Sequence, residues 1–392
     1  MFENIIGHKH TVELLKDQVR ENRLPGSILI DGPRYAGKLT LALELARVLT
    51  CTRGGEWNCT CSSCRNQKLL IQNDTLLLGY DNFMEEISVA YQLLLRNDQV
   101  YTRYMFLRSI RKLLRRFDPV FYDDKETKFK KVQPLLAYLE ESLSNIDPEN
   151  IASPLKTKEL DSIVENAAAL SKELNLSTIP VGQIRKVTFW AHTSTTENRK
   201  VVIIENAEKM NDSARNSMLK ILEEPPAECF FVFLSSRTGE IIPTIRSRLR
   251  SYHLKERNTE ENQQVLSQIF RETSGSFTTI SSFFDSFDPD VENLSDLAGR
   301  VLSYLLAESR SIAEKEELKE LCREIKGDSM KVFLEKLLEK ARLMIPEADF
   351  RSSYMLEELC RKINRIWFDF ESLNMNPQLL SEYLLYDDGG RI

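Results

Sequence analysis

Four cysteines near the N-terminus have the residue type and spacing of a metal site. Cys51, Cys59, Cys61 and Cys64 fall within fourteen residues, whereas the other three cysteines stand alone, at Cys229, Cys322 and Cys360. Four thiolates are enough for a closed tetrahedral Zn²⁺ site with no coordination position left for water. The cluster therefore predicts a structural zinc ion. Unmetallated surface cysteines are the alternative, and a catalytic thiol is disfavoured because no histidine lies within the cluster.

Residues 32–38 have the composition of a phosphate-binding loop. They read Gly-Pro-Arg-Tyr-Ala-Gly-Lys and match the pattern G-x4-G-K, in which backbone N–H groups wrap a phosphate and the lysine meets its oxygens. The candidates for nucleotide binding are its two glycines and its lysine, Gly32, Gly37 and Lys38. Leu39 replaces the hydroxyl residue that should hold Mg²⁺. Thr40, one position later, is not expected to replace this ligand, because one step along a helix turns a side chain by about 100°.

The acidic partner of such a loop is also altered. The apolar run Val201–Ile204 ends in Glu205 and Asn206, where an active ATPase of this kind would have Asp-Glu. Glu205 could still approach a metal ion, but the amide of Asn206 cannot act as a general base toward water. We therefore expect a phosphate-loop fold that does not hydrolyse ATP, and whether ATP or ADP still binds there is left open.

Short apolar runs that alternate with helical patterns surround these residues. Ser27–Ile30 is expected to be a strand before the glycine loop. The helix expected to open near Gly37 or Lys38 has an apolar face for a sheet, formed by Leu41, Ala42, Leu45, Ala46 and Leu49. Two further strands are expected, at Val201–Ile204 and Phe230–Leu234. This order predicts an α/β domain with a parallel sheet.

No strand-like run stands out between about Phe83 and Leu176, and this stretch has helical periodicity instead. We expect a helical insertion in the α/β domain, with helices at Glu86–Leu95, Tyr101–Phe117, Gln133–Leu143 and Leu160–Leu174. Beyond Glu256 the pattern is again mostly helical. The predicted domains are 1–255, with a cysteine knuckle at 51–64 and the insertion at about 83–176, then a small domain at 256–290 and a helical domain at 291–392.

One expected helix of the insertion is strongly basic. It carries Arg103, Arg108, Arg111, Lys112, Arg115 and Arg116, and its opposite stripe is apolar. An amphipathic helix with a solvated polar face is one interpretation of this pattern. Contact with DNA or with a protein partner is the other, because four of the basic residues fall on one helical face.

Composition limits the remaining possibilities. The chain has 392 residues, 53 basic and 59 acidic side chains and a net charge of -6, which disfavours nucleic-acid binding through an all-over basic surface. The length corresponds to about two to three domains. No apolar run approaches the roughly 20 residues of a membrane span, and the N-terminus lacks the pattern of a secretion signal. We therefore expect a cytoplasmic protein.

Several motifs together resemble the clamp-loader branch of the AAA+ family. Residues 2–8 resemble that family's start, and residues 23–30 resemble the approach to its phosphate loop. The most specific stretch is 211–226, which ends in Leu-Lys-Ile-Leu-Glu-Glu-Pro-Pro and resembles the helix after the family's acidic strand. Residues 245–249, Ile-Arg-Ser-Arg-Leu, resemble its Ser-Arg-Cys motif with leucine in place of cysteine.

The resemblance implies an AAA+ domain, a small lid domain and a helical collar through which five subunits associate in a ring. It also implies that Arg248, with Ser247 beside it, acts in trans as an arginine finger on ATP bound by a neighbouring motor subunit. The implied partners are gamma/tau motor subunits, a delta subunit, the sliding clamp and primed DNA, within the DNA polymerase III holoenzyme.

Three functions compete at this point. The first is a non-motor clamp-loader subunit, which has no ATPase or polymerase activity of its own. The second is a self-sufficient AAA+ ATPase of the gamma/tau motor type, against which Leu39 and Asn206 argue. The third is a zinc-dependent nucleic-acid-binding module with a vestigial nucleotide fold.

Overall fold

The structure of the protein is a computed structural model, and it describes residues 1–79, 83–122, 127–174, 178–193, 199–226, 228–307, 311–325, 329–345, 350–373 and 376–385. The chain divides into two compact units, Met1–Ile280 and Ser281–Ile392. The expected domain boundaries near residues 255 and 290 remain predictions. No helix among the described residues is long and apolar enough to span a membrane.

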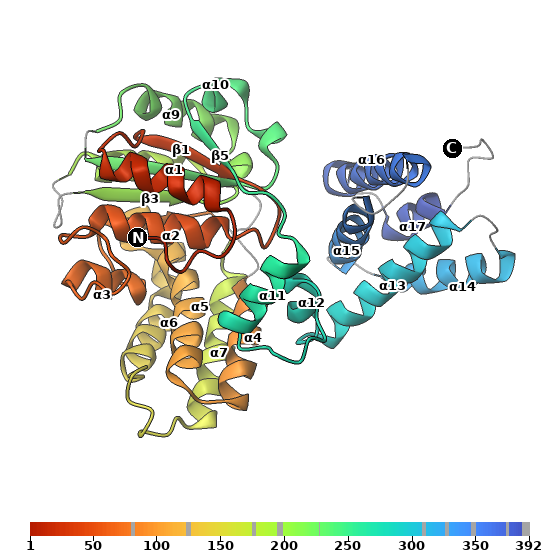
Figure 1. The fold of residues 1–392 in the computed structure, drawn as a ribbon, viewed down its shortest axis with the longest axis horizontal. Helices are drawn as coiled ribbons and strands as arrows, with labels where there is room; N and C mark the ends of the chain where they lie inside the picture. Colours follow the sequence, from red (N-terminus) through yellow and green to blue (C-terminus); the bar gives the residue numbers. More distant parts are fainter. Residues whose placement is uncertain are drawn as a thin grey trace. The chain divides into compact units, whose positions relative to one another are not determined.

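A parallel sheet organises the first unit (Figure 1). Its strands lie in the order β2-β3-β4-β1-β5, and every neighbouring pair is parallel. The strands are β1 (Ser27–Asp31), β2 (Thr75–Leu78), β3 (Lys200–Ile204), β4 (Cys229–Ser235) and β5 (Arg250–His253). The three expected strands and the parallel sheet are thus confirmed. The two edge strands, β2 and β5, were not predicted.

Helices cover both faces of this sheet because alternate strand residues point to opposite sides. Ile28 and Ile30 of β1 are buried in a cluster with α1 and α2, whereas Leu29 is buried in a second cluster with α8, α9 and α10. The covering helices are α1 (Lys9–Arg20), α2 (Lys38–Thr50), α8 (Val181–Ala191), α9 (Asp212–Glu223) and α10 (Pro243–Arg246). The apolar face expected on the helix after the glycine loop is therefore buried, as an α/β layer requires.

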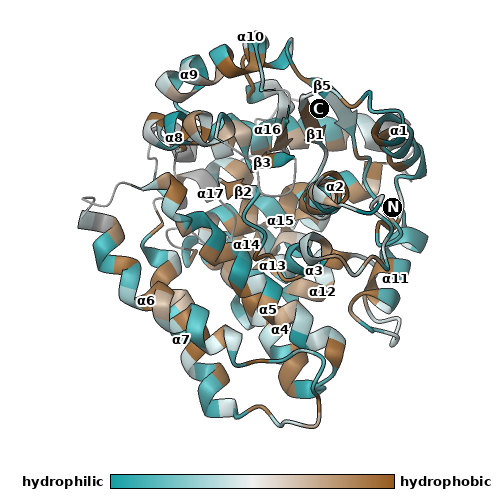
Figure 2. Ribbon diagram, turned by 90° about the vertical axis from the view of Figure 1, so that its left-hand side faces the viewer, coloured by the Kyte–Doolittle hydropathy of each residue, from teal (hydrophilic) through white to brown (hydrophobic). Residues whose placement is uncertain are grey.

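The described residues between β2 and α8 are helical apart from their connections. This region has a hydrophobic cluster of its own, to which four helices contribute. They are α4 (Phe83–Arg96), α5 (Val100–Leu114), α6 (Thr127–Ser144) and α7 (Thr157–Lys172), with 3₁₀ turns at Arg115–Phe117 and Pro119–Phe121. Figure 2 shows hydrophilic and hydrophobic residues mixed along α6 and α7, as expected for helices with one buried side. The four helices expected in the insertion are thus present.

Two short helices complete the first unit. Helix α3 (Ser62–Lys68) follows the cysteine loop, and α11 (Thr259–Gln268) follows β5. A capping box begins α11, in which Asn258 and Glu261 each accept a hydrogen bond from the other's backbone N–H.

The second unit is helical throughout its described residues. Buried residues between Ala298 and Leu385 form a separate hydrophobic cluster. A buried ion pair joins Lys336 to Asp285 at 2.6 Å, and so ties α12 to α15. The helices are α12 (Ile280–Asp285), α13 (Pro289–Leu306), α14 (Ile312–Arg323), α15 (Ser329–Met344), α16 (Phe350–Leu373) and α17 (Pro377–Leu385).

Candidate functional site

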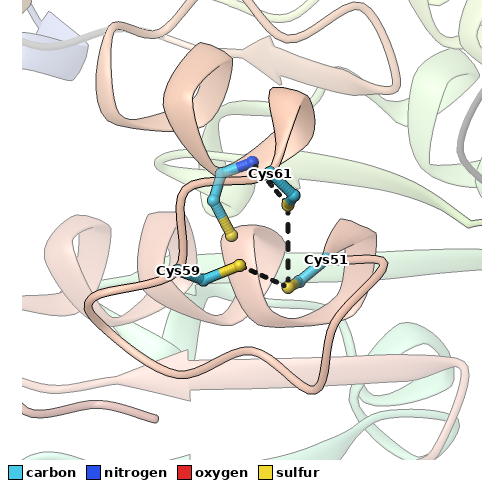
Figure 3. A group of neighbouring side chains, drawn as sticks. Cys51, Cys59 and Cys61 are labelled. Carbon is cyan, nitrogen blue, oxygen red and sulfur yellow. Dashed lines mark hydrogen bonds between the residues drawn. The ribbon is translucent and has the colours of Figure 1, made fainter.

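The four clustered cysteines converge at the end of helix α2. Cys51 is the C-terminal cap of α2, and Cys61 is the N-terminal cap of α3, so two helix ends hold the loop that carries Cys59. The sulfur of Cys51 lies 3.7 Å from that of Cys59 and 3.9 Å from that of Cys61 (Figure 3). All four sulfurs, including that of Cys64, lie within 4.8 Å of one another. This group could therefore hold a metal ion.

These distances fit a tetrahedral ion bound by sulfur. A Zn–S bond of about 2.3 Å places the sulfurs of a tetrahedral site about 3.8 Å apart. Backbone N–H groups also point at the sulfurs, since Gly55 N lies 3.1 Å from Cys51 Sγ and Cys64 N lies 3.4 Å from Cys61 Sγ. Burial alone would raise the pKa of the Cys61 thiol, but hydrogen bonds from Cys64 and Thr52 lower it to about 6. Burial instead raises the pKa of the Cys51 and Cys64 thiols, so without an ion Cys61 is the cysteine among these three whose surroundings favour the thiolate, the metal-binding form.

The glycine loop lies where the pattern predicts, between β1 and α2. A Cβ atom on Gly32 would lie 2.4 Å from the carbonyl oxygen of Leu254, so no larger residue fits there. Gly37 has a φ of 91° and begins α2. The ammonium group of Lys38 donates hydrogen bonds to the carbonyl oxygens of Gly32, at 2.8 Å, and Pro33, at 2.6 Å. In this structure the lysine therefore contacts its own loop.

Three distant residues also hold this loop, and the sequence patterns did not reveal their contacts. His8 Nε2 lies 2.9 Å from the carbonyl oxygen of Ala36. Arg257, which follows β5, donates to the carbonyl oxygen of Tyr35. The hydroxyl of Tyr35 in turn donates to Glu85 of α4 at 2.6 Å. Each contact joins residues far apart in sequence, so spacing alone contains no signal for it.

The residues expected to hold or activate the metal of a nucleotide do not share one surface. Leu39 packs against the core beneath α2, and Thr40 is exposed. Glu205 is buried at the end of β3 and forms an ion pair with the equally buried Arg116. A carboxylate that is paired and buried in this way is not presented to a bound ion in this structure.

Arg248 and Ser247 lie on the surface, at the end of α10. The side chain of Arg248 is 35% exposed and is hydrogen-bonded to the Glu223 carboxylate at 2.6 Å and the Thr244 carbonyl at 2.8 Å. Ser247 Oγ donates to the Thr244 carbonyl oxygen at 3.1 Å. Arg248 is therefore accessible but restrained within its own chain.

The basic residues of α5 and of the 3₁₀ turn after it do not form a solvated face, so that interpretation is wrong. Arg103 and Arg116 are almost fully buried, and Lys112 pairs with Glu86 at 2.6 Å. The other three guanidinium groups donate to backbone carbonyl oxygens of the segment from α3 to β2: Arg108 to Gln67 and Lys68, Arg111 to Leu69 at 3.0 Å, and Arg115 to Gln72 at 2.8 Å and to Thr75. Carbonyls at a helix end have no partner within the helix, and a cation there is favoured by the helix dipole.

Comparison with known families assigns the chain. A family model described as "DNA polymerase III, delta subunit" matches residues 7–99 and 141–258, which is more than half of the chain. The chain belongs to this family, and the resemblance to clamp-loader subunits is thereby confirmed. The matched segments include the glycine loop, the cysteine cluster and both ends of the expected insertion. Helix α5 lies in the segment between them.

Individual relatives agree with this assignment over shorter stretches. The chain is 35% identical over 101 residues to DNA polymerase III subunit delta' of Buchnera aphidicola, covering 22% of this chain and 30% of that protein. It is 39% identical over 87 residues to subunit delta' of Escherichia coli, covering 22% and 26%. A gamma/tau subunit of Mycobacterium tuberculosis is 38% identical over 53 residues, covering 14% and 9%. The chain thus spans less than a third of the length of these relatives.

One solved structure is similar over most of its length. It is a gamma-subunit-related protein of DNA polymerase III from Thermotoga maritima, and the alignment covers 96% of this chain and 97% of that one. The sequence identity is 15% and the TM-score is 0.42. A likeness of this size carries no argument about function.

Proposed function

We propose that this chain is a non-motor, delta-prime-like subunit of the bacterial DNA polymerase III clamp loader. It would help the motor subunits load the sliding clamp onto primed DNA, a process driven by the ATP that those subunits hydrolyse. The burial of Glu205 against Arg116 carries the non-motor part of the proposal, and the partly buried Leu39, which packs against the core, supports it. Both positions would otherwise serve the Mg²⁺ ion of ATP hydrolysis.

In this proposal Arg248 acts as an arginine finger in trans, with Ser247 beside it. The supporting observations are that both residues are exposed and lie at the end of a short helix. A guanidinium placed against the γ-phosphate on a neighbouring subunit would stabilise the charge that develops during phosphoryl transfer, an effect worth about 10³ to 10⁵ in rate. Arg248 would have to leave Glu223 to do so.

The four cysteines would hold a structural Zn²⁺ ion. A closed four-sulfur site supplies a cross-link and no catalytic position. Cys51 and Cys61 stand at the facing ends of α2 and α3, so the ion would fix one helix end against the other. This cross-link accounts for an ordered loop between them that has few apolar residues.

The remaining parts of the proposal concern assembly. Residues 256–290 would form a lid and residues 291–392 a collar that joins gamma/tau and delta subunits in a hetero-pentamer. The supporting observation for the collar is that residues 298–385 have a hydrophobic cluster of their own. ATP or ADP could occupy the Gly32–Lys38 loop without being hydrolysed.

The test is the ATPase rate of a reconstituted clamp loader in the presence of clamp and primed DNA. Complexes containing wild-type chain, Arg248→Ala or Arg246→Ala are compared, and the chain is also assayed alone. Arg246 is a matched control because it is exposed and lies two residues away in the same motif. We expect the isolated chain to be inactive. Arg248→Ala should lower turnover of the assembled complex at least tenfold, and Arg246→Ala should leave it within twofold of wild type.

The alternatives predict different behaviour of the isolated chain, in ATP turnover or in DNA binding. A gamma/tau-like motor, which the mycobacterial relative favours, predicts DNA-stimulated ATP turnover by the chain alone. A zinc-dependent nucleic-acid-binding module predicts tight binding of the isolated chain to DNA, with a steep salt dependence. Equal ATPase rates for all three complexes would rule out the arginine finger.

A further inference from the structure

A buried arginine connects the cysteine cluster to the body of the first unit. Arg47 lies one turn before the end of α2, and its side chain is 2% exposed. Nε and Nη2 donate to the two oxygens of Glu44, at 2.8 and 2.7 Å. Glu44 also accepts the backbone N–H of Phe2 at 3.0 Å, so the carboxylate is fixed from two sides.

The remaining N–H groups of Arg47 point into the cysteine loop. Nη2 donates to the carbonyl oxygen of Gly55 at 2.7 Å, and Nη1 donates to the carbonyl oxygen of Glu56 at 2.9 Å and to the sulfur of Cys64 at 3.1 Å. A guanidinium has five N–H groups, and all five of these have an acceptor. One planar group therefore holds the backbone between Cys51 and Cys59 and a third cysteine sulfur at once.

This geometry has two consequences for a metal bound by the cysteines. Four thiolates around a divalent cation carry a net charge of about -2, and hydrogen bonds to the sulfurs disperse that charge. In addition, Gly55 and Glu56 belong to the loop between two of the cysteines, so fixing their carbonyls limits where Cys51 and Cys59 can lie. Arg47 thus brings a positive charge into contact with Cys64 Sγ.

We propose that Arg47 is a positioning residue of the cysteine metal site, which orients the ligand loop and the Cys64 sulfur before the ion binds. Glu44 orients Arg47. This inference rests on the metal site proposed above. It adds a residue outside the cysteine cluster whose removal weakens metal binding without removing a ligand. Changes in groups that support metal ligands typically lower affinity 10- to 100-fold.

The insertion contains a matched control for this arginine. Arg103 of α5 is 1% exposed, and its five N–H groups also have five acceptors. Two of these acceptors are the carboxylate oxygens of Asp98, just as two acceptors of Arg47 are the carboxylate oxygens of Glu44. The other three are backbone carbonyl oxygens, with no sulfur among them. Loss of a buried arginine is therefore common to both variants, and contact with the cysteine site is not.

The experiment measures metal affinity of the full-length chain by competition with a chelator, for wild type, Arg47→Met, Arg47→Lys and Arg103→Met. Zinc is the ion for which the protein and the chelator compete. The sulfur-to-metal charge-transfer band of the Co²⁺-loaded protein reports ligation directly. We expect 10- to 100-fold weaker binding for Arg47→Met and a smaller loss for Arg47→Lys, which keeps the charge with fewer donors. Arg103→Met should bind as wild type does.

The outcomes separate this inference from the metal site itself. If wild type binds neither ion, or if Cys61→Ser binds as tightly as wild type, the proposed site is wrong. If wild type binds the metal and both Arg47 variants keep the wild-type affinity, the site stands and the role of Arg47 is overturned. Equal losses for Arg47→Met and Arg103→Met would also overturn it. If Arg47→Met does not fold, Arg47→Lys decides by the same comparison with Arg103→Met.

Discussion

His8, Arg257 and Glu85 hold the glycine loop, and His8 is the one among them whose ordinary pKa lies near neutral pH. Burial, together with the nearby Arg257 charge, lowers the pKa of His8 below its ordinary value. As the pH falls through about 6.5, the unfolded chain takes up a proton before the folded chain does. The contribution of neutral His8 to stability is therefore complete above that pH and is lost below it.

We predict that His8→Gln flattens the acid side of the stability profile. Glutamine cannot titrate, and its amide can still donate to the Ala36 carbonyl. Urea unfolding at pH 7.5 and 5.5 would measure the effect, with His10→Gln as control because His10 is exposed two residues away. The wild type and the His10 variant should lose more stability on acidification than the His8 variant. Three equal slopes would contradict the assignment.

At the scale of elements, α5 is attached to the cysteine region by guanidinium groups on backbone carbonyls. We predict that the double change Arg108→Leu and Arg111→Leu loosens this attachment. The free energy of unfolding should fall by about 1–3 kcal/mol for each buried carbonyl oxygen that is left without a donor. Hydrogen exchange should accelerate in α5 and in residues 67–75, and remain slow in β1 and β4. Lys158→Leu is the control, because Lys158 is exposed on α7. Unchanged exchange in residues 67–75 would show that the attachment does not depend on these arginines.

The elements also show what the sequence could and could not predict. Strands β1, β3 and β4 are buried runs of apolar residues, and periodicity identified them. Strand β5 has one buried residue in four, Tyr252, and so lacks an apolar pattern. The convergence of the cysteines was predictable because four thiols within fourteen residues have the number and spacing of a closed zinc site. The Arg116–Glu205 pair was not, because it joins residues 89 apart, one within the insertion and one at the end of β3.

At the scale of the whole molecule, the two units have separate hydrophobic clusters, and the cysteine site belongs to the first unit alone. We predict two thermal transitions in calorimetry, of which a chelator lowers only one. A ligand present at 100 times its dissociation constant stabilises the folded state by about 2.7 kcal/mol, so the shift should be several degrees.

Two observations would check this assignment of transitions. In Cys61→Ser, the chelator should no longer lower the temperature of the first unit's transition. The transition of the second unit should occur at the same temperature in wild type and in Cys61→Ser. A single transition, or a chelator effect on both, would mean that the units do not unfold independently.

The attachment of α5 has a consequence for how the sequence can vary. The acceptors in residues 67–75 are main-chain oxygens, which every amino acid provides, whereas the donors are the side chains of particular arginines. Substitutions should therefore be tolerated on the side that supplies carbonyl oxygens and not on the side that supplies arginine side chains. In a saturation library, Leu69 should accept many residue types without releasing α5, while Arg111 should accept almost none.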